Sequence, residues 1–435
     1  MAVDFLCTLL SHPQPRDSGD YLHRVAWPGR ALGELTAVEA VQTTHPQALQ
    51  KALHADLLVI HMVADASMQI LMEQRQAAGR PTVFEISDDF CNFPEHLPGA
   101  AFYADAGVQA LIRQLAASAD AVQFSSPFLA QKYADLNPVR QVFPNQLEHA
   151  PDPDPPPTGT HHPALGWAGS IGHLDEARAL ADMLSRWRGR ARYRFHVMAA
   201  PEIVRVFRQA GLQVETETTG DMRQYLRFLD RLDIGIAIAN RDDFSAGRSD
   251  GKFIEYASRG VVAVCSAGAP YADSVRDGET GFLFSDESNL HAILDRLTQE
   301  PALRQRIRQQ ALDYLRRERT HAAAAGERLA FYQERLERTG DISLATCMEH
   351  RSPGYTECID PIETELLQAM LLHRDGQPGP ALECYTRLAE REPAFHLLWE
   401  RMGQACAALG AAEQAAECRL RAQSLLARSL SIIPS

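Results

Sequence analysis

The stretch Asp233–Ser266 decides the fold, with the sequence DIGIAIANRDDFSAGRSDGKFIEYASRGVVAVCS. Its first seven residues form an apolar run of strand length, and Val261–Ser266 forms a second one. A polar loop, Asn240–Gly251, and a helix-like stretch, Lys252–Arg259, lie between them. This order of strand, loop, helix and strand is typical of a parallel sheet covered by helices.

The same alternation continues on both sides of this stretch. The predicted strands are Ala164–Ala168, Tyr193–Ala199 and Gly281–Phe284, and the predicted helices are Leu174–Trp187 and Glu202–Ala210. From Glu287 to Arg338 the pattern is mostly helical. Residues 164–340 are therefore predicted to form one Rossmann-like domain.

A second series of this kind lies closer to the N-terminus. It predicts strands over Val3–Leu10, Ala55–Val63, Thr82–Ile86 and Ala121–Phe124, with helices over Ala66–Ala78 and Gly107–Ala119. Ala150–Pro163 separates the two series and contains six prolines in fourteen residues, which excludes a helix or a central strand. We therefore expect an α/β chain with two Rossmann-like domains, 1–150 and 164–340, joined by a linker, 151–163.

The last part of the chain contains an internal repeat. Gly376 and Gly410 lie 34 positions apart, and so do Ala381 and Ala415. A period of 34 with small residues at helix-packing positions, Trp399 in a first helix and Gly403 four residues later resembles tetratricopeptide repeats. Residues 360–430 are predicted to form a small all-α unit of about two repeats, which packs on the rest of the chain because so few repeats do not stand alone.

Composition excludes several classes of protein. The formal net charge of −13 argues against nucleic acid as a partner, since binding phosphates needs an excess of Lys and Arg. No apolar run approaches the roughly 18 residues of a membrane-spanning helix, and Met1–Leu10 lacks the features of a secretory signal. The eight cysteines are scattered without C-x-x-C spacing, so we expect a reducing, cytoplasmic environment.

A phosphate-binding turn is predicted where the strand Ala164–Ala168 ends, in the sequence LGWAGSIGHLD of Leu165–Asp175. Small residues at Gly169 and Ser170 let a ligand approach the backbone, and the N-terminus of the following helix favours an anion. A plain tight turn would have the same sequence, and this alternative stays open.

Lys252 and Glu255 lie three residues apart, near one face of the predicted helix. A lysine at a helix start suits a diphosphate, and a carboxylate one turn later suits a ribose diol. A surface ion pair of small energetic value is the alternative.

Four segments in this order resemble the C-terminal half of retaining nucleotide-sugar glycosyltransferases of the bacterial group 1 type, which have the two-domain GT-B fold. They are GWAGS with the following His173, DIGIA, RSDGKFIEYASRGVVAV and APYADSVRDGETGFLF. Two earlier segments, VFEISDDF and ADAVQFSSPFLAQKYADLNPVRQVFPNQLE, resemble the N-terminal half. The resemblance covers roughly residues 1 to 335.

The resemblance implies that the two domains face a cleft, and it implies a donor site and a set of catalytic residues. Glu255 would hold the donor ribose, Arg248 and Lys252 would neutralise the diphosphate leaving group, and the donor site would also include Gly169, Ser170, His173, Asn240 and Tyr271. The substrate would be a UDP-, GDP- or dTDP-sugar, with no cofactor and no metal ion, because cationic side chains and helix ends take the place of a metal. The catalytic set would be Asp88, Asp89, Arg248 and Lys252.

One position departs from the family pattern. The first Glu of the family's E-x7-E motif, which usually contacts the donor sugar, corresponds to Gly247 here. Asp242, Asp243 or Ser245 in the same loop could take its place. The identity of the sugar and the anomeric outcome stay open for this reason.

The first domain carries the candidate acceptor residues. Asp88 and Asp89 follow a strand, at the end where α/β folds bind ligands, although either could cap the next turn. Asp20, Tyr21 and Arg24 follow the loop Ser11–Gly19 and are predicted to face the acceptor, the alternative being an ordinary helix start. His61 lies in an apolar run and is expected to be a core histidine with its hydrogen bonds satisfied.

The resemblance predicts a glycosyltransferase of polysaccharide or glycoprotein biosynthesis, whose acceptor is a glycan, a lipid-linked glycan or a protein. The basic helix Ala302–Arg319 is expected to be a solvated face, or otherwise a docking surface at the inner face of the membrane. The alternative function is a non-catalytic, transferase-like interaction protein that binds a protein partner through its repeats. Stabilisation by nucleotides would distinguish the enzyme from this alternative.

Overall fold

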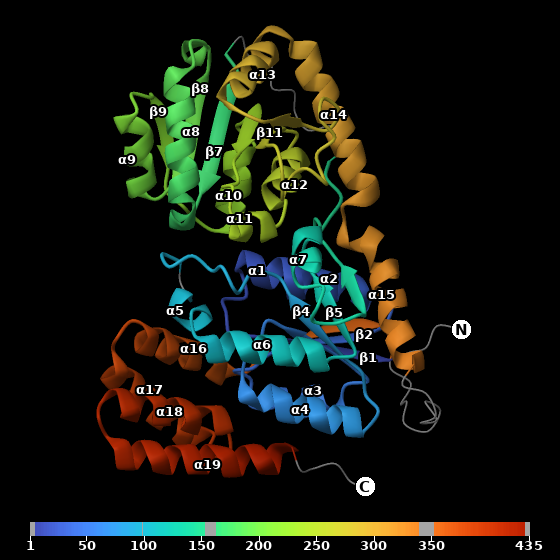
Figure 1. Ribbon diagram of the computed structural model, residues 1–435, viewed down its shortest axis with the longest axis vertical. Coiled ribbons are helices and arrows are strands. Elements are labelled where there is room, and N and C mark those ends of the chain that lie inside the picture. The colour runs from blue at the N-terminus through green and yellow to red at the C-terminus, as the bar shows by residue number, and fades with distance from the viewer. Residues whose placement is uncertain (1–4, 98, 153–161, 339–351, 431–435) are drawn as a thin grey trace.

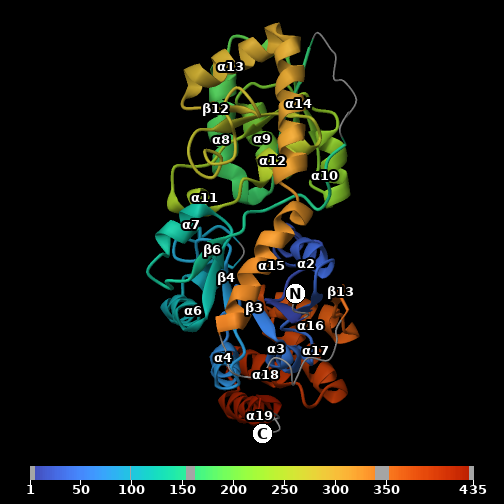
Figure 2. The same cartoon turned by 90° about the vertical axis from the view of Figure 1, so that its right-hand side faces the viewer.

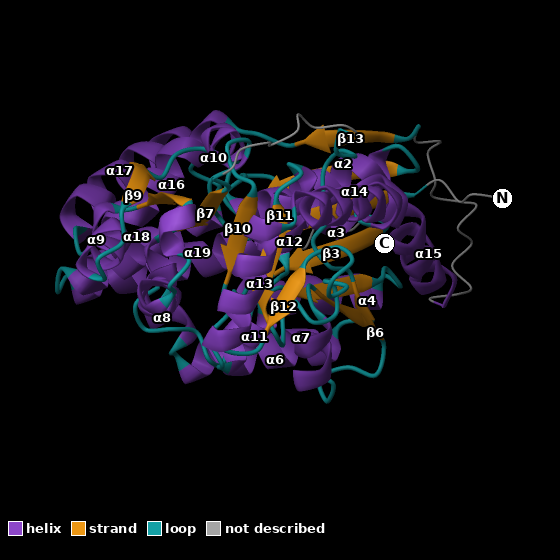
Figure 3. Cartoon of the chain, turned by 90° about the horizontal axis from the view of Figure 1, so that it is seen from above, coloured by secondary structure: helices purple, strands orange, loops and turns teal. Residues whose placement is uncertain are grey.

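The computed structural model describes residues 5–97, 99–152, 162–338 and 352–430. These residues form two α/β units, one above the other in Figure 1, and a bundle of helices beyond the first unit. Every strand pairing within the two sheets is parallel. Helices surround the strands of both sheets (Figure 3), as the two Rossmann-like domains predicted from the sequence require.

The first unit contains a seven-stranded sheet in the order β13-β2-β1-β3-β4-β5-β6. Its strands β3 and β4 are buried along their whole length, as expected for the centre of a parallel sheet. The elements are β1 (Leu6–Ser11), α1 (Gly19–Tyr21), the π-helical segment η1 (Leu22–Ala26), α2 (Trp27–Gly33), β2 (Ala37–Gln42), α3 (Ala48–His54), β3 (Leu57–His61), α4 (Ala66–Ala77), β4 (Thr82–Ile86), α5 (Ala100–Tyr103), α6 (Ala106–Ser118), β5 (Ala121–Phe124), α7 (Pro127–Lys132) and β6 (Arg140–Val142).

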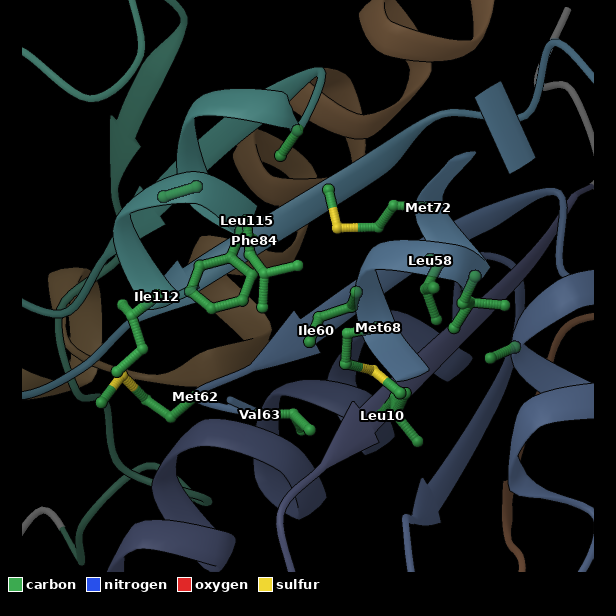
Figure 4. Packing of buried hydrophobic residues seen from close by; sticks show 14 of the residues in the cluster. Leu10, Leu58, Ile60, Met62, Val63, Met68, Met72, Phe84, Ile112 and Leu115 are labelled. Atoms are coloured by element: carbon green, nitrogen blue, oxygen red, sulfur yellow. The ribbon is translucent and has the colours of Figure 1, made fainter. Parts of the chain in front are cut away.

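The core of this unit lies between the sheet and helices α4 and α6. Figure 4 shows side chains of these helices and of the loop after β3 packed with residues from β1, β3 and β4; the labelled ones are Leu10, Leu58, Ile60, Met62, Val63, Met68, Met72, Phe84, Ile112 and Leu115. All of them are buried. Their burial stabilises the first sheet.

The second unit contains a six-stranded sheet in the order β12-β11-β10-β7-β8-β9. Strand order reverses between β7 and β10, and this is the place where open α/β sheets bind ligands. The elements are β7 (Ala164–Gly169), the 3₁₀ turn η2 (Ile171–His173), α8 (Leu174–Arg186), the 3₁₀ turn η3 (Arg190–Arg192), β8 (Arg194–Ala199), α9 (Pro201–Gln209), β9 (Val214–Glu217), α10 (Met222–Leu229), β10 (Ile234–Ala237), α11 (Asp243–Gly247), α12 (Gly251–Ser258), β11 (Val262–Ser266), β12 (Phe282–Phe284), α13 (Glu287–Gln299) and α14 (Pro301–Glu318).

The chain returns to the first unit after α14. Helix α15 (His321–Arg338) runs down beside the first unit in Figure 2, and its Tyr332 Oη donates a hydrogen bond of 2.9 Å to Gln123 Oε1 of the first sheet. Tyr332 and Leu336 belong to the same buried cluster as Phe5 and Cys7. The end of the predicted second domain thus packs on the first. Most of the predicted linker, residues 153–161, lies outside the described residues.

The described elements of residues 360–430 are all helices, as predicted, and a short strand that the sequence analysis missed, β13 (Gly354–Glu357), precedes them and pairs with β2. The bundle consists of α16 (Pro361–Arg374), α17 (Pro378–Arg391), α18 (His396–Ala408) and α19 (Ala412–Leu430). Gly376 and Gly410 both have positive φ, 76° and 78°, at the turns that follow α16 and α18. The 34-residue period therefore corresponds to two helix hairpins, while their assignment as tetratricopeptide repeats stays a prediction.

Helix α19 lies against α3 and α4 of the first unit, and its Leu430 joins the core of that unit. Arg16, in the loop after β1, links this loop to the last part of the chain. Its guanidinium donates to Tyr21 Oη at 2.7 Å, Glu357 Oε1 at 2.9 Å, the Cys358 carbonyl at 2.9 Å and Glu363 Oε2 at 2.6 Å. The bundle is thus joined to the first unit at two places.

The basic helix α14 differs from the solvated face that was expected. Arg304, Arg308 and Arg319 are buried, and Arg319 binds Asp250 with both terminal nitrogens, at 2.7 and 3.0 Å. Arg306, Arg316 and Arg317 are exposed. None of the helices in the described part of the chain has both the length and the hydrophobicity needed to span a bilayer.

Candidate functional site

A cavity of about 170 Å³ lies at the reversal point of the second sheet. Five of the residues predicted to bind the donor line it: His173, Arg248, Lys252, Glu255 and Tyr271. The other lining residues are Glu176, Ile238, Ala239, Ser245, Ser249, Gly251 and Pro270. The cavity is therefore built from the segments after β7, β10 and β11 and from α11 and α12.

Two cationic side chains and a histidine give this cavity its electrostatic character. The Arg248 terminal nitrogens lie 3.3 and 3.1 Å from Nδ1 and Nε2 of His173. Burial lowers the pKa of His173, which favours the neutral ring beside this guanidinium. The Lys252 Nζ lies 5.0 Å from the centre of the Tyr225 ring, and burial lowers its pKa while the charge of Glu255 opposes that change. The negative charge of an anionic ligand would compensate Lys252 for the hydration that it loses on burial.

Glu255 lies one turn after Lys252 on α12 and is held from two sides. Its Oε2 accepts a hydrogen bond of 2.7 Å from Tyr225 Oη, and its Oε1 lies 4.0 Å from Nε2 of His23 in the first unit. The hydrogen bond from Tyr225 thus orients the carboxylate, which can accept hydrogen bonds from a diol.

The remaining predicted donor residues, Gly169, Ser170 and Asn240, are not among those that line this cavity. A Cβ at Gly169 would come within 2.5 Å of the Trp167 ring, so no larger residue fits at the end of β7. Ser170 is exposed and precedes η2, so α8 begins four residues later than the predicted turn. Asn240 lines an adjoining cavity, which shares Arg248 with the first one.

Glu176 is a site residue that the sequence analysis missed. It is buried, with Oε1 lying 3.4 Å from His173 Nδ1 and 3.8 Å from Arg248. Burial is the largest single influence and raises the pKa of Glu176, but the hydrogen bond with His173 and the charges of His173 and Arg248 together outweigh it, so the pKa is lowered. Its spacing of three residues from His173 on a helix start was the available signal.

The two aspartates after β4 have different surroundings. Asp89 is fully buried and accepts hydrogen bonds from Tyr133 Oη, from Lys132 Nζ at 2.6 Å and from Asn92 at 2.9 Å. Asp88 is only half-buried, and burial together with the charge of Asp20 raises its pKa to about 7. Asp89 therefore holds the first unit together, and Asp88 is the aspartate that can exchange a proton near neutral pH.

The predicted acceptor residues also separate into two kinds. Tyr21 is buried and donates a hydrogen bond of 2.8 Å to Glu357, while Arg24 is buried and binds Glu85, the Phe143 carbonyl and Asn145. Because Tyr21 and Arg24 are buried and used in these internal contacts, we assign neither of them to acceptor binding. Asp20 lies between His12 and His61, at 3.7 and 3.5 Å.

His61 is buried as expected, with Nε2 3.0 Å from Ser87 Oγ. Its Nδ1, however, has no hydrogen-bond partner among the described residues, so the ring is only partly satisfied. It lies at the last position of β3 and not within the interior of the strand.

Gly247, where the family has its first Glu, lies at the contact between the two units. Its carbonyl accepts a hydrogen bond of 3.1 Å from Ser126 Oγ, and a Cβ there would lie 3.0 Å from Leu129 and 3.4 Å from the Cβ of Asp89. Of the three proposed substitutes, Ser245 lines the cavity, Asp242 caps α11 through the Ser245 amide at 2.7 Å, and Asp243 binds Lys132 at 2.8 Å.

Comparison with known proteins agrees with this architecture. Residues 178–330 match the model of a family described as glycosyl transferase-like. The structure of HepE from Anabaena in complex with UDP has a TM-score of 0.54 at 15% identity, with 75% of this chain and 99% of that chain covered. Sucrose-phosphate synthase from Thermosynechococcus elongatus has a TM-score of 0.55 at 12% identity, with 77% and 100% covered.

WaaG, a glycosyltransferase involved in lipopolysaccharide biosynthesis, has a TM-score of 0.52 at 12% identity, with 75% of this chain and 99% of that chain covered. No curated protein matches the sequence. The likenesses in structure extend over both units, whereas the family model covers most of the second. The chain therefore has the two-domain GT-B fold of glycosyltransferases, and its second unit is similar in sequence to the glycosyl transferase-like family.

Proposed function

We propose that this protein is a glycosyltransferase that moves a sugar from a nucleotide-diphosphate sugar to a glycan, a lipid-linked glycan or a protein. The observation that carries the proposal is the convergence of Arg248, Lys252 and Glu255 on one cavity at the reversal point of the second sheet. A nucleoside diphosphate has the matching chemistry, namely a diol for the carboxylate and two phosphates for the cations.

In the reaction, the bond between the sugar C1 and the diphosphate oxygen breaks, and C1 bonds to an acceptor hydroxyl. Arg248 and Lys252 stabilise the charge that develops on the leaving diphosphate, so no metal ion is needed on the donor side. The acceptor proton passes to a base of the first unit, and Asp88 has a suitable pKa of about 7. Retention of the anomeric configuration is part of the proposal, by resemblance to the group 1 type.

The solved structures favour UDP as the first nucleotide to test. HepE has been crystallised with UDP, with UDP and glucose, and with UDP-glucose. At 13 to 15% identity these structures share the fold alone, so GDP- and dTDP-sugars belong in the same test.

The experiment is a thermal-shift screen of the full chain with UDP, GDP and dTDP at millimolar concentration, with and without EDTA. We expect one nucleotide to raise the Tm in both conditions, since a ligand that binds the native state stabilises it. Glu255→Gln should abolish the shift, and Glu202→Gln, an exposed position on α9, should leave it unchanged. A chain that responds to none of the nucleotides would instead be an interaction protein without donor binding.

Donor hydrolysis across UDP-, GDP- and dTDP-sugars then identifies the sugar. Transfer to protein or glycan acceptors is measured with the same donor.

A further inference from the structure

We propose that His12, Asp20 and His61 form a binding site for a divalent transition-metal cation on the first unit. Within the described residues, these three form the one cluster of His, Cys, Asp or Glu whose candidate ligand atoms all lie within 4.8 Å of one another. The sequence had predicted no metal ion anywhere in the protein, so the proposal departs from that expectation. It does not depend on the proposed function, because the donor cavity contains none of these residues.

The topology brings the three side chains together. In the first sheet β1 pairs with both β2 and β3, so the strand order reverses between β1 and β3. His12 follows the last residue of β1, and His61 is the last residue of β3. The carboxyl ends of two such strands form a crevice in which α/β folds bind ligands. Asp20 lies in α1, directly after the loop that follows β1, and its carboxylate is close to both histidines.

The distances suit a shared cation. Asp20 Oδ2 lies 3.7 Å from Nε2 of His12, and Oδ1 lies 3.5 Å from Nε2 of His61. Ligand atoms about 2.0–2.1 Å from a tetrahedral zinc ion lie about 3.3–3.5 Å apart, so small side-chain rotations are enough. Binding would replace the hydrogen bond between His61 Nε2 and Ser87 Oγ with a coordination bond.

Two of the three ligands, His61 and Asp20, are held by the local backbone structure around them. The Met62 backbone, directly after His61, adopts a φ of 50°, a left-handed conformation that is uncommon for a residue other than glycine. Asp20 is fixed because Ser18 caps its helix by accepting a hydrogen bond of 3.2 Å from the Tyr21 amide. A site whose ligands are held by separate elements loses little entropy when a cation binds.

The charges around the cluster favour a cation as well. Asp20 and the neighbouring Asp88 carry carboxylates that repel each other, and this repulsion contributes to the raised pKa of Asp88. Arg24, on the next helical segment η1, is already paired with Glu85. A dication would compensate the two carboxylates together.

Two imidazoles and one carboxylate are ligands for Zn²⁺, Mn²⁺, Fe²⁺ or Co²⁺, whereas Mg²⁺ and Ca²⁺ prefer oxygen atoms. Three protein ligands leave coordination positions for water or for a hydroxyl group of a substrate. The site would thus hold an oxygen ligand on the acceptor side of the cleft, apart from the diphosphate.

The test uses the full-length chain without an affinity tag, stripped with EDTA, and two probes, Zn²⁺ by calorimetry and Co²⁺ by visible absorption. We expect one equivalent of either metal, with at least tenfold weaker binding and loss of the Co²⁺ bands in His12→Gln and in Asp20→Asn. The control is His196→Gln, because His196 is also buried and lies 3.5 Å from a carboxylate, that of Glu215, but has no third ligand.

His12 is half-buried on a loop, so its variant is expected to keep the native circular dichroism spectrum and Tm. Less than 0.3 equivalents of bound metal in the wild-type chain would overturn the proposal. Equal affinity in wild type, His12→Gln and His196→Gln would overturn it too, because the metal would then be bound elsewhere.

Discussion

Replacing Lys252 by Met tests the donor cavity most directly. A unit charge about 4 Å from a phosphate charge contributes about 4 kcal/mol at the effective dielectric constant of about 20 that suits such sites. Part of this is offset, because Lys252 is also attracted by Glu255 and is already desolvated in the free protein. We expect about 2–3 kcal/mol to remain, which weakens binding of the nucleoside diphosphate by about 30–150-fold.

Isothermal titration calorimetry at two salt concentrations measures this change. The affinity for the nucleoside without phosphates should stay within a factor of two, because Lys252 acts on the diphosphate. Lys51→Met, which removes a half-exposed lysine from the first unit, is the matched control. A loss of less than threefold for the diphosphate, or an equal loss for the nucleoside, would refute the assignment of Lys252 to the leaving group.

Four further changes have expected outcomes. Because the pKa of Asp88 is raised to about 7, the folded chain binds this proton more tightly than the unfolded chain, and the contribution of Asp88 to stability falls as the pH rises from about 4 to 7. In urea unfolding, the stability at pH 7 relative to that at pH 4 should be higher by about 1–2 kcal/mol in Asp88→Asn than in the wild type, and the same pH difference in both chains would exclude this role of Asp88. Asp89→Asn should cost about 2–3 kcal/mol in the same assay, because it weakens a buried, fully hydrogen-bonded carboxylate, and a cost below 0.5 kcal/mol would contradict that role. Arg16→Met should lower stability by about 2 kcal/mol and speed hydrogen exchange of the β13 amides, whereas exchange in the second sheet stays as it was. Gly247→Glu should lower the Tm by forcing a carboxylate toward Asp89, whereas Gly247→Ala should change the free energy of unfolding by no more than about 1 kcal/mol. Equal Tm values for the two variants would contradict this effect of the carboxylate.

The sequence predicted the second unit closely because its strands are continuous apolar runs. Predicted Ala164–Ala168 and observed β7, Ala164–Gly169, differ by one residue, and β7 is buried along its whole length. Strands with polar residues were missed. The strand β2 contains Glu39 and is partly exposed, and β9 has the sequence VETE at the edge of its sheet. Only pairing with a neighbour makes such segments strands, and that information is not local.

The same difference between local patterns and contacts of distant segments applies to the site residues. Arg248, Lys252 and Glu255 lie within eight residues on and before α12, so their spacing alone brought them together. Tyr21 and Arg24 were assigned to the acceptor because their partners, Glu357 and Glu85, lie 336 and 61 residues away. No local pattern shows that a polar side chain will be used by a distant segment.

The position of β13 has a consequence for the order in which the molecule assembles. The first sheet starts with the residues synthesised first, yet its edge strand and the α15 contacts come from residues 321–357. As the chain leaves the ribosome, the second unit can complete its sheet with β12, at Phe284, before the first unit has its outer strand. The half of the protein that is made first is therefore finished last, and until then the amide and carbonyl groups of β2 face water on one side.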